Sequence, residues 1–440
     1  MRVDDAIQPA NDFEHLYLGL PMSNERLSQR IHIAFVNHTA QLGGGEIALR
    51  NLLERLDQTR FQVSVVLCAD GPLVEQIRKR HPVRVIPMES RIGDARKASI
   101  GWTSLLRLRD VFSALRYTWR LSRSIRLLDA QAVHTNSLKA HLLGGIAGRL
   151  AGVPVIWHMR DRIAPDYLPQ GAVRLVKILS WVIPTFIVAN SQATLDTLTD
   201  GKRRAKSRVV HDGCEVPVSM SGPEQNQPVK VGLIGRISPW KGQHIFIQAA
   251  GLIRNEFPDV RFQIIGAPLF SEFEYESELK RLTADLQLER QVEFTGFVRD
   301  VQGAIEELQI VVHASTVGEP FGQVVIEGMA AGRPVIATNG GGVPEIVVDQ
   351  VTGLLVPMND ARALADAMAS LLRNPGKGRA MGARGRRRVE DLFTIERSAK
   401  AVEQVYLDLL SPPSTVVDVL EEEVDVAQRE AVLEARADYE

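Results

Sequence analysis

The most constraining feature of this sequence is an alternation of short apolar segments with longer helical patterns, which occurs twice along the chain. The first round opens on the apolar, β-branched segment Ile31–Thr39, and the second opens on Val229–Ser238. Each of these segments runs into a glycine-containing loop and then into helical periodicity. Strands that alternate with helices form parallel sheets covered by helices on both faces. The sequence therefore predicts an α/β protein with two Rossmann-like, doubly wound parallel-sheet domains.

The chain length supports two domains, because 440 residues are comfortable for two units of about 200 residues each. A segment rich in Pro, Gly and Ser precedes the second opening strand, and it has little periodicity, as linkers do. Near the end, an amphipathic helix is followed by a Ser-Pro-Pro-Ser break and an acidic segment that we expect to be disordered. The predicted parts are an extension (1–30), a first domain (31–210), a second domain (211–392), the amphipathic helix (393–410) and a tail (411–440).

Composition excludes several classes of protein. Cys68 and Cys214 are the only cysteines, and they provide neither a disulfide framework nor a metal-ligand cluster, which favours a reducing compartment. The first 30 residues lack the apolar core of a secretory signal, and no uninterrupted apolar run reaches the about 18 residues of a spanning helix. We therefore expect a cytoplasmic protein.

Charge is distributed unevenly although the net charge of the chain is only −1. Residues 31–210 hold 27 Lys and Arg against 13 Asp and Glu, a net charge of +14. A basic half on an otherwise neutral protein predicts an anionic partner for that half. A solvated basic surface without such a partner is the alternative interpretation.

Glycine-rich loops follow predicted strands in both halves. Gly43, Gly44, Gly45 and Glu46 open a helix after the first strand, and Gly340–Gly342 precede Glu345 in the same way near the end of the second half. Glycine lets the backbone approach a ligand, and the free N–H groups at a helix start favour phosphate. The first loop is neither a GxGxxG motif nor a P-loop, and alone it fits a plain tight turn.

A pair of cations leaves the first strand of the second half. Arg236 and Lys241 lie five residues apart on a loop bounded by Gly235 and Gly242. In open α/β sheets ligands bind outside the carboxyl ends of the strands. Two cations at such a place suit a diphosphate, although two solvated surface cations would give the same pattern.

Two glutamates eight residues apart form the most unusual motif. Glu319 lies in a loop after a buried strand, and Phe321-Gly322-Gln323 then begins a helix on which Glu327 shares a face with Gln323. Carboxylates accept hydrogen bonds from paired hydroxyls, so the two together can hold two polyol groups of one ligand. A helix-start acid and an unrelated surface glutamate would be the plain alternative.

These motifs together resemble glycosyltransferase family 4, the retaining enzymes of the GT-B fold. The resemblance covers about residues 31–410 and rests on the segments "GRISPWKGQ" and "EPFGQVVIEGMAAGRPVIATNGGGVPEIVVDQVTGLLV", with a looser match at "GGGE", "VIWHMRD" and "FIVANS". It implies two Rossmann-like domains facing a central cleft, with the acceptor bound by the first domain and a nucleotide-sugar donor by the second. The helix at 393–410 would cross back onto the first domain.

The resemblance also implies a role for each motif residue. Arg236 and Lys241 would clamp the donor pyrophosphate, Glu319 would contact the transferred sugar, and Glu327 would bind the ribose. Gly44 would approach the phosphate from the first domain, and the loop around Phe297 would contact the base. The residues expected at the donor are Gly44, Gly235, Arg236, Lys241, Phe297, Glu319, Phe321, Gly322, Gln323 and Glu327, with Arg236, Lys241 and Glu319 as the catalytic group.

The chain departs from the family pattern in the first domain. Many members carry two histidines there, the second of which contacts the sugar, but here His134 is followed at the second place by Asn136. His158 is another candidate for the acceptor and sugar side, and a structural role is the alternative for either histidine. The retaining chemistry of the family needs no general base, since the leaving phosphate can accept the proton of the incoming hydroxyl. No Asp-x-Asp metal motif is present, so we expect neither a metal nor another cofactor.

The acceptor side is predicted from Arg91–Ala130, where Arg alternates with apolar residues. A basic amphipathic helix of this kind lies on anionic membranes, which would suit a lipid-linked glycan as acceptor. A core-packing helix with an exposed basic face is the alternative. The apolar residues of this segment are Trp102, Leu105, Phe112, Leu115, Trp119 and Leu121.

The sequence therefore predicts a retaining glycosyltransferase that moves a sugar from a nucleoside-diphosphate donor to a hydroxyl of a glycan or lipid-linked acceptor, in surface polysaccharide or glycolipid synthesis. We expect it in the cytoplasm or at the inner face of a membrane, without a nucleic-acid partner. A GT-B nucleotide-sugar epimerase, a phosphorylase and a catalytically silent nucleotide-sugar-binding subunit are the alternatives.

Overall fold

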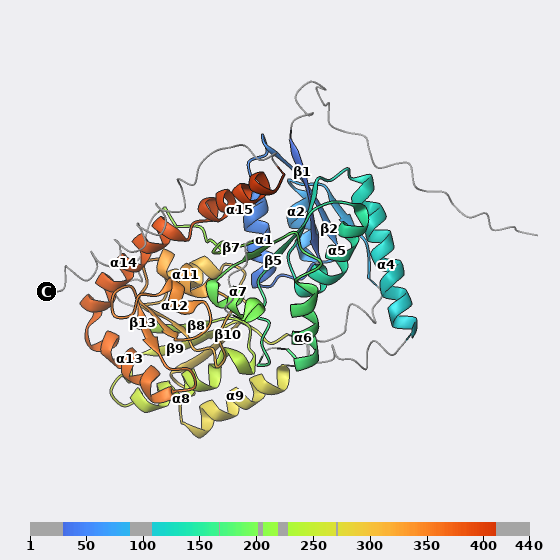
Figure 1. Ribbon diagram of the computed structural model, residues 1–440. Helices are drawn as coiled ribbons and strands as arrows, with labels where there is room; N and C mark the ends of the chain where they lie inside the picture. The colour runs from blue at the N-terminus through green and yellow to red at the C-terminus, as the bar shows by residue number, and fades with distance from the viewer. Residues whose placement is uncertain are drawn as a thin grey trace, which may run out of the picture.

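The computed structural model describes residues 30–88, 108–166, 168–200, 206–218, 228–269 and 272–410. The predicted extension before Arg30, the acidic tail 411–440 and the apolar residues Trp102 and Leu105 lie outside these residues. The described part forms two α/β domains, one blue to green and one yellow to orange in Figure 1.

The first domain is built on a seven-stranded sheet in which every pairing is parallel. The strand order is β3-β2-β1-β4-β5-β6-β7, so the chain moves outward from β1 first in one direction and then in the other. The strands are β1 (Ile31–Asn37), β2 (Phe61–Leu67), β3 (Val83–Val85), β4 (Ala132–Thr135), β5 (Val155–Met159), β6 (Phe186–Ala189) and β7 (Ser207–Val209).

The helices of the first domain connect these strands. They are α1 (Gly44–Arg55), α2 (Pro72–Arg78), α4 (Leu108–Leu127), α5 (Leu138–Ala151), α6 (Gln170–Leu179) and α7 (Gln192–Thr199). Local signals end and begin them as expected: α5 stops at Gly152, which adopts a left-handed conformation, and Ser191 caps α7 by accepting a hydrogen bond from the N–H of Thr194.

The second domain has a six-stranded parallel sheet in the order β10-β9-β8-β11-β12-β13. The strands are β8 (Lys230–Ile234), β9 (Arg261–Ile265), β10 (Val292–Gly296), β11 (Ile310–His313), β12 (Val335–Thr338) and β13 (Leu354–Val356). The helices are α8 (Gln243–Ile253), α9 (Phe273–Asp285), α10 (Val301–Glu306), α11 (Gln323–Ala330), α12 (Val343–Ile346), α13 (Ala361–Arg373) and α14 (Pro375–Leu392), with the 3₁₀ turn η3 (Pro239–Lys241) before α8.

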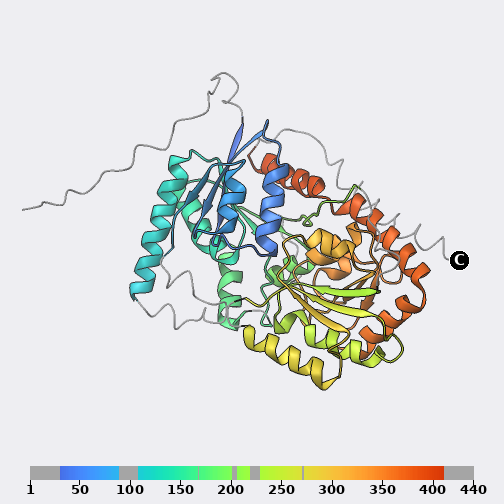
Figure 2. The same cartoon turned by 180° about the vertical axis from the view of Figure 1, so that it is seen from behind.

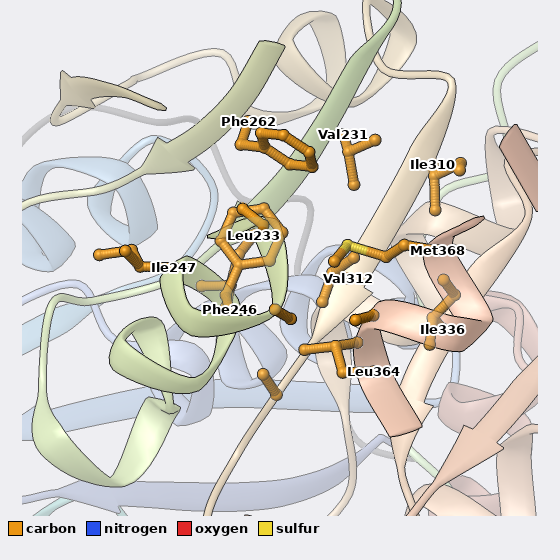
Figure 3. Close-up of a cluster of buried hydrophobic side chains, with 14 of the residues drawn as sticks. Val231, Leu233, Phe246, Ile247, Phe262, Ile310, Val312, Ile336, Leu364 and Met368 are labelled. Atoms are coloured by element: carbon orange, nitrogen blue, oxygen red, sulfur yellow. The ribbon is translucent and has the colours of Figure 1, made fainter. Parts of the chain in front are cut away.

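Each sheet is covered by apolar side chains on both faces. In the second domain one such cluster joins α8 and α13 to the central strands through Phe246, Phe262 and Met368, which Figure 3 shows packed together with their neighbours. Buried on both faces, these strands are almost continuously apolar, as parallel strands are. The predicted fold class, two doubly wound parallel-sheet domains, is confirmed.

The last helix, α15 (Ile395–Leu410), returns to the first domain. Its buried side chains Val402, Val405 and Tyr406 join the cluster formed by α1, α2 and the first strands. In both Figure 1 and Figure 2 this red helix lies beside the blue helix α1. The first domain is therefore completed by a segment that follows the second domain in the chain.

Some elements differ from the patterns read in the sequence. The edge strand β7 was not expected, because its three residues lie in a short segment flanked by charged residues. The helix after Gly340–Gly342 is only four residues long, since Val347 already has an extended backbone.

Candidate active site

The loop after β8 brings Lys241 to the carboxyl end of the neighbouring strand β11. Gly242 makes this approach possible, because it adopts a φ of +72° and a Cβ atom there would lie 1.9 Å from the carbonyl oxygen of Ala314. Gly235, with a φ of +153°, also uses backbone freedom that other residues rarely have. The sequence therefore needs glycine at both ends of this loop for structural reasons.

Lys241 is paired with Glu319, the first glutamate of the eight-residue motif. Its Nζ atom lies 2.5 Å from Oε1 of Glu319 and 4.3 Å from the centre of the Trp240 ring. The hydroxyl of Ser315 donates to the same carboxylate oxygen at 2.6 Å, and Nε2 of His313 lies 3.0 Å from it. Three side chains from one strand end and one loop thus converge on a single carboxylate oxygen.

Glu319 is buried, with 7% of its surface exposed. Burial alone would raise the pKa of this carboxyl group, but the charges and hydrogen bonds of Lys241 and His313 hold the pKa well below its usual value. The carboxylate is therefore ionised at neutral pH and fixes Lys241 in place. Because one ammonium group has three N–H donors, Lys241 can keep this bond and still donate to a ligand.

The second glutamate, Glu327, lies one turn into α11. Nε2 of Gln323 donates to its Oε1 at 3.1 Å, and burial raises the pKa of Glu327 to about 7. Gly322, before the helix, has a φ of +134°. Phe321 is buried and its ring stacks on that of His211, so only its backbone could contact a ligand.

The two remaining donor candidates of the second domain are accessible. Nε of Arg236 lies 3.3 Å from Oε2 of Glu272, and the Arg236 side chain is about one-third exposed. Phe297 follows β10 and is 74% exposed, an unusual state for a large aromatic ring. Arg236 follows β8 and Phe297 follows β10, on the far side of β9, so both lie at the same carboxyl edge of the sheet as Lys241.

In the first domain, Gly44 begins α1 with an open surface around it. A Cβ atom at Gly44 would meet nothing within 4 Å, and its φ is not positive. Neither packing nor backbone conformation therefore requires glycine here. Two residues further on, Glu46 accepts a hydrogen bond from Nδ2 of Asn37 at 3.2 Å, and burial raises the pKa of Glu46.

Asn136 belongs to a buried polar network at the carboxyl edge of the first sheet. Its amide donates to the carbonyl of Gly45 at 3.0 Å, and its side-chain oxygen accepts a hydrogen bond from Arg160. Arg160 in turn pairs with Asp212 at 2.8 Å, and Asp212 accepts from Asn190 at 3.2 Å. The position where many family members carry histidine thus serves here to tie three strand ends together.

For His134 and His158 the structure favours the alternative, a structural role, over a place on the acceptor and sugar side. Both side chains have no exposed surface. Nε2 of His134 lies 3.1 Å from Nδ1 of His158, and the hydroxyl of Tyr406 lies 2.7 Å from Nδ1 of His134. Burial lowers the pKa of both histidines well below the usual value, so they are neutral members of the core. Each histidine lies one residue before the end of its strand, and because both faces of this sheet are covered, either side-chain direction is buried.

The carboxyl edges of the two domains meet through hydrogen bonds that the sequence motifs did not predict. Arg162 donates to the carbonyl of Gly318 at 2.9 Å, and Ser191 and Thr194 both donate to the carbonyl of Pro320 at 2.5 and 2.9 Å. Glu345, which follows the second glycine loop, contacts the start of α7 in the first domain. The loop that carries Glu319 is therefore held from both domains.

Other parts of the described surface offer weaker sites. A groove of about 420 Å³ lies between α1 and α15, but Arg55 on its wall is already paired with Glu396 at 2.8 Å. In the described residues, no three His, Cys, Asp or Glu side chains are arranged to hold a metal ion. No helix of the described part combines the length and the apolar character needed to cross a bilayer.

Two family models match the chain in succession. "Glycosyltransferase Family 4" matches residues 42–216, and "Glycosyl transferases group 1" matches residues 220–388. The boundary between the two matches lies close to the segment that links the two sheets. The two ranges contain, respectively, Gly44 and Asn136 of the first domain and the cluster of Lys241 and Glu319 in the second.

Two curated relatives illustrate the similarity. D-inositol 3-phosphate glycosyltransferase of Mycobacteroides abscessus is 30% identical over 281 residues, which cover 57% of this chain and 62% of that protein. The lipopolysaccharide core biosynthesis mannosyltransferase LpsB of Rhizobium meliloti is 31% identical over 182 residues, which cover 41% and 52%. The matched parts thus span about half to three-fifths of these relatives.

A solved structure matches over a longer range. Anabaena Alr3699/HepE in complex with UDP and glucose is 25% identical, with a TM-score of 0.74 over 87% of this chain and 100% of that one. The same protein in complex with UDP-glucose gives a TM-score of 0.73 at 25% identity, over 86% and 100%. With both domain models matched in order and this arrangement of two parallel-sheet domains, the chain belongs to glycosyltransferase family 4 and has the GT-B fold.

Proposed function

We propose that this protein transfers a sugar from a nucleoside-diphosphate donor to a hydroxyl group, with retention of the anomeric configuration. The observation that carries the proposal is the cluster at the end of β11, where Lys241, Ser315 and His313 converge on Glu319. This cluster lies beside the start of α11, whose first N–H groups have no partner within the helix. A cation beside free N–H groups suits the diphosphate of a donor, and a carboxylate beside them suits the hydroxyls of its sugar.

The proposed reaction breaks the bond between the anomeric carbon and the diphosphate oxygen. Negative charge develops on the leaving diphosphate, where Lys241 and Arg236 would neutralise it. The acceptor hydroxyl attacks the same face of the sugar, and its proton passes to the leaving phosphate oxygen. The chain then needs no general base, which agrees with the burial of His134 and His158. Glu327 would accept hydrogen bonds from the ribose, and Phe297 would contact the base.

A uridine donor is the first to test, because Anabaena Alr3699/HepE was solved with UDP and with UDP-glucose. A thermal-shift screen against UDP-, GDP- and ADP-sugars would identify the donor, since a ligand that binds only the folded state raises the melting temperature. NMR of the released sugar would then give the anomer. Release of the α-anomer from an α-linked donor supports retention, whereas release of the β-anomer would contradict it.

The same screen separates the alternatives. A nucleotide-sugar epimerase would convert the donor into its epimer without an acceptor, and a phosphorylase would require phosphate and a glucan. A silent binding subunit would be stabilised by a donor and release no sugar under any acceptor condition. The relatives that act on inositol phosphate and on lipopolysaccharide core suggest polyol and glycan acceptors for the first transfer assays.

We further propose that the acceptor is presented at an anionic membrane, on which the exposed face of α4 lies. Phe112, Leu115 and Trp119 project from this face with 58 to 69% of their surfaces exposed, while Leu121 on the opposite side is fully buried. The helices α4, α5 and α6 carry nine Lys or Arg and one Asp. Large exposed apolar side chains surrounded by Lys and Arg are typical of helices that bind anionic bilayers in the interfacial plane.

Co-sedimentation with lipid vesicles tests the membrane proposal. Vesicles containing phosphatidylglycerol should bind the protein, and pure phosphatidylcholine vesicles should bind it weakly. Leu115→Glu with Trp119→Glu should release it, whereas Leu252→Glu, on the exposed face of α8 in the second domain, should not. Equal sedimentation of all these variants, or binding to an acidic protein in place of the vesicles, would contradict the proposal.

A further inference from the structure

Glu345 acts across the domain interface on the first turn of α7. Its two carboxylate oxygens accept the backbone N–H groups of Gln192 and Ala193, each at 2.9 Å. Nε2 of His211 lies 3.0 Å from the same carboxylate. The first N–H groups of a helix lack partners inside it and carry partial positive charge. The second domain thus supplies a helix cap for the first domain.

The neighbouring side chains of α7 bind the second domain at a different point. Ser191 and Thr194 both donate to the carbonyl of Pro320, at 2.5 and 2.9 Å, so one carbonyl accepts two hydroxyls. Pro320 directly follows Glu319 in the chain. The start of α7 therefore grips the second domain at two places, the carboxylate of Glu345 and the carbonyl of Pro320.

These two places are joined to each other by backbone contacts. The N–H of Gly342 donates to the carbonyl of Glu319 at 2.9 Å, and Gly341 forms a β-bridge with Glu319. A Cβ atom at Gly341 would lie 1.9 Å from that carbonyl oxygen, so the two loops cannot separate without breaking this packing. The loop that precedes Glu345 and the loop that carries Glu319 are therefore packed directly against each other.

The helix that carries Glu345 is also held from within its own domain. Arg388 of α14 donates to the carbonyls of Ile346 and Glu345, at 2.8 and 3.0 Å. Burial of Glu345 opposes its ionisation, but the hydrogen bonds from His211 and from the N–H groups of α7 lower its pKa below the usual value. The carboxylate is therefore charged where it meets the first domain, because the contacts made there lower its pKa.

We propose that Ser191, Thr194 and Glu345 form an interdomain clasp, which closes the two domains and fixes the Glu319 loop for sugar transfer. Within this clasp, Glu345 and Thr194 act as positioning residues. This rests on the transfer reaction proposed above. Among the described residues, no hydrogen bond joins a clasp side chain to the side chain of a donor candidate; the clasp acts through the backbone of Glu319 and Pro320. Most donor candidates lie in the second domain, with Gly44 as the candidate from the first, so donor binding should largely survive the loss of the clasp.

Two conservative variants test the clasp. Glu345→Gln keeps the shape of the side chain but places an amide N–H against one N–H of α7, and Thr194→Val removes a single hydroxyl. Glu256→Gln is the matched control, because it breaks an ion pair with Arg373 inside the second domain and touches nothing in the first. Melting temperatures would show that all three variants fold.

Three measurements on the full chain separate the clasp from its alternatives. In Glu345→Gln and Thr194→Val, we expect the UDP affinity measured by calorimetry to stay within about twofold of the wild-type value. Turnover in both variants should fall by about tenfold or more, since misplacement of a catalytic group is costly. The radius of gyration in solution X-ray scattering should increase in Glu345→Gln and stay unchanged in the control Glu256→Gln. Unchanged turnover and radius, or a loss of UDP affinity that matches the loss of turnover, would overturn the proposal.

The scattering measurement does not depend on transfer activity. If the wild-type chain bound UDP but transferred no sugar, the proposed function would fail, and an enlarged radius for Glu345→Gln would still support the clasp as a device that closes the domains. A wild-type radius that equals that of Glu345→Gln would refute the clasp even in an active enzyme.

Discussion

The carboxyl edges of the two sheets carry similar polar side chains and use them in different ways. At the edge of the second sheet, Lys241, Ser315 and His313 surround one carboxylate, and Arg236 and Phe297 stay accessible. At the edge of the first sheet, the charges of Arg160 and Asp212 satisfy each other inside the protein. The comparison teaches that one edge keeps charged and aromatic side chains accessible, as the proposed donor site requires, whereas the other uses its charges to hold strand ends together.

The largest effect should come from the edge of the first sheet, as a loss of stability. Asp212→Ala leaves the buried Arg160 without its partner and should lower the free energy of unfolding by about 3–5 kcal/mol. Chemical denaturation measures this loss. Asp408→Ala is the control, because its pair with Arg208 is exposed and should contribute less than about 1 kcal/mol. Equal losses for the two variants would show that the network around Arg160 is not structural.

The counterpart at the edge of the second sheet is a loss of activity. Lys241→Met removes the cation expected at the leaving diphosphate and should lower turnover by about 100-fold or more. Steady-state kinetics with the donor found by thermal shift measures this effect. Lys280→Met, which removes a lysine paired with Glu276 on the outer helix α9, should leave turnover unchanged. A Lys241 variant with nearly full activity would remove this residue from the catalytic group.

The elevated pKa of Glu327 predicts pH-dependent donor binding. Its pKa is about 7 in the folded chain against an ordinary 4.5, so protonation favours the fold; this contribution is complete below pH 4.5 and is lost as the pH rises through 7. Ribose hydroxyls would donate to the ionised form, so donor affinity should rise by about tenfold from pH 6 to pH 8. Calorimetry at both values tests this. Glu327→Gln should abolish the rise, and a rise that persists would exclude the ribose role.

The smallest effect should come from Gly44, where the first domain leaves open space. A methyl group there meets no protein atom, so Gly44→Ala should change stability by at most about 1 kcal/mol. If a phosphate approaches this backbone, the methyl group should weaken donor affinity by roughly fivefold. Gly376→Ala at the start of α14 is the control, since a Cβ there would make only an ordinary contact, 3.4 Å from Oδ1 of Asn374. Equal affinities would remove Gly44 from the donor site.

Much of the fold could be predicted because the signals for it are local. Strand periodicity, glycine loops and the amphipathic last helix are each read from ten or twenty neighbouring residues. The grouping of Arg236, Lys241 and Glu319 at one sheet edge also followed, since parallel strands present their carboxyl ends together. The pairing of Lys241 with Glu319 itself did not follow, because a loop can direct a side chain to either of two ligands, a phosphate or a carboxylate.

The parts that could not be predicted depend on residues far apart in the sequence. Glu345 meets Gln192 across 153 residues, and Tyr406 meets His134 across 272 residues. Gly340–Gly342 suggested only another strand–loop–helix junction, and nothing near Glu345 indicated that another domain would cover it. His134 and His158 sit at strand ends, where one residue of register decides between the cleft and the core.

The return of α15 to the first domain has a consequence for how the protein is made. When the first domain leaves the ribosome, the apolar surface of β1, α1 and β2 is still uncovered. Val402, Val405 and Tyr406, which cover it, are synthesised only after the whole second domain. Domains generally fold in the order of synthesis, but here the first one reaches its final form last. During translation, a nascent chain of this protein therefore exposes an apolar surface that its own final helix covers.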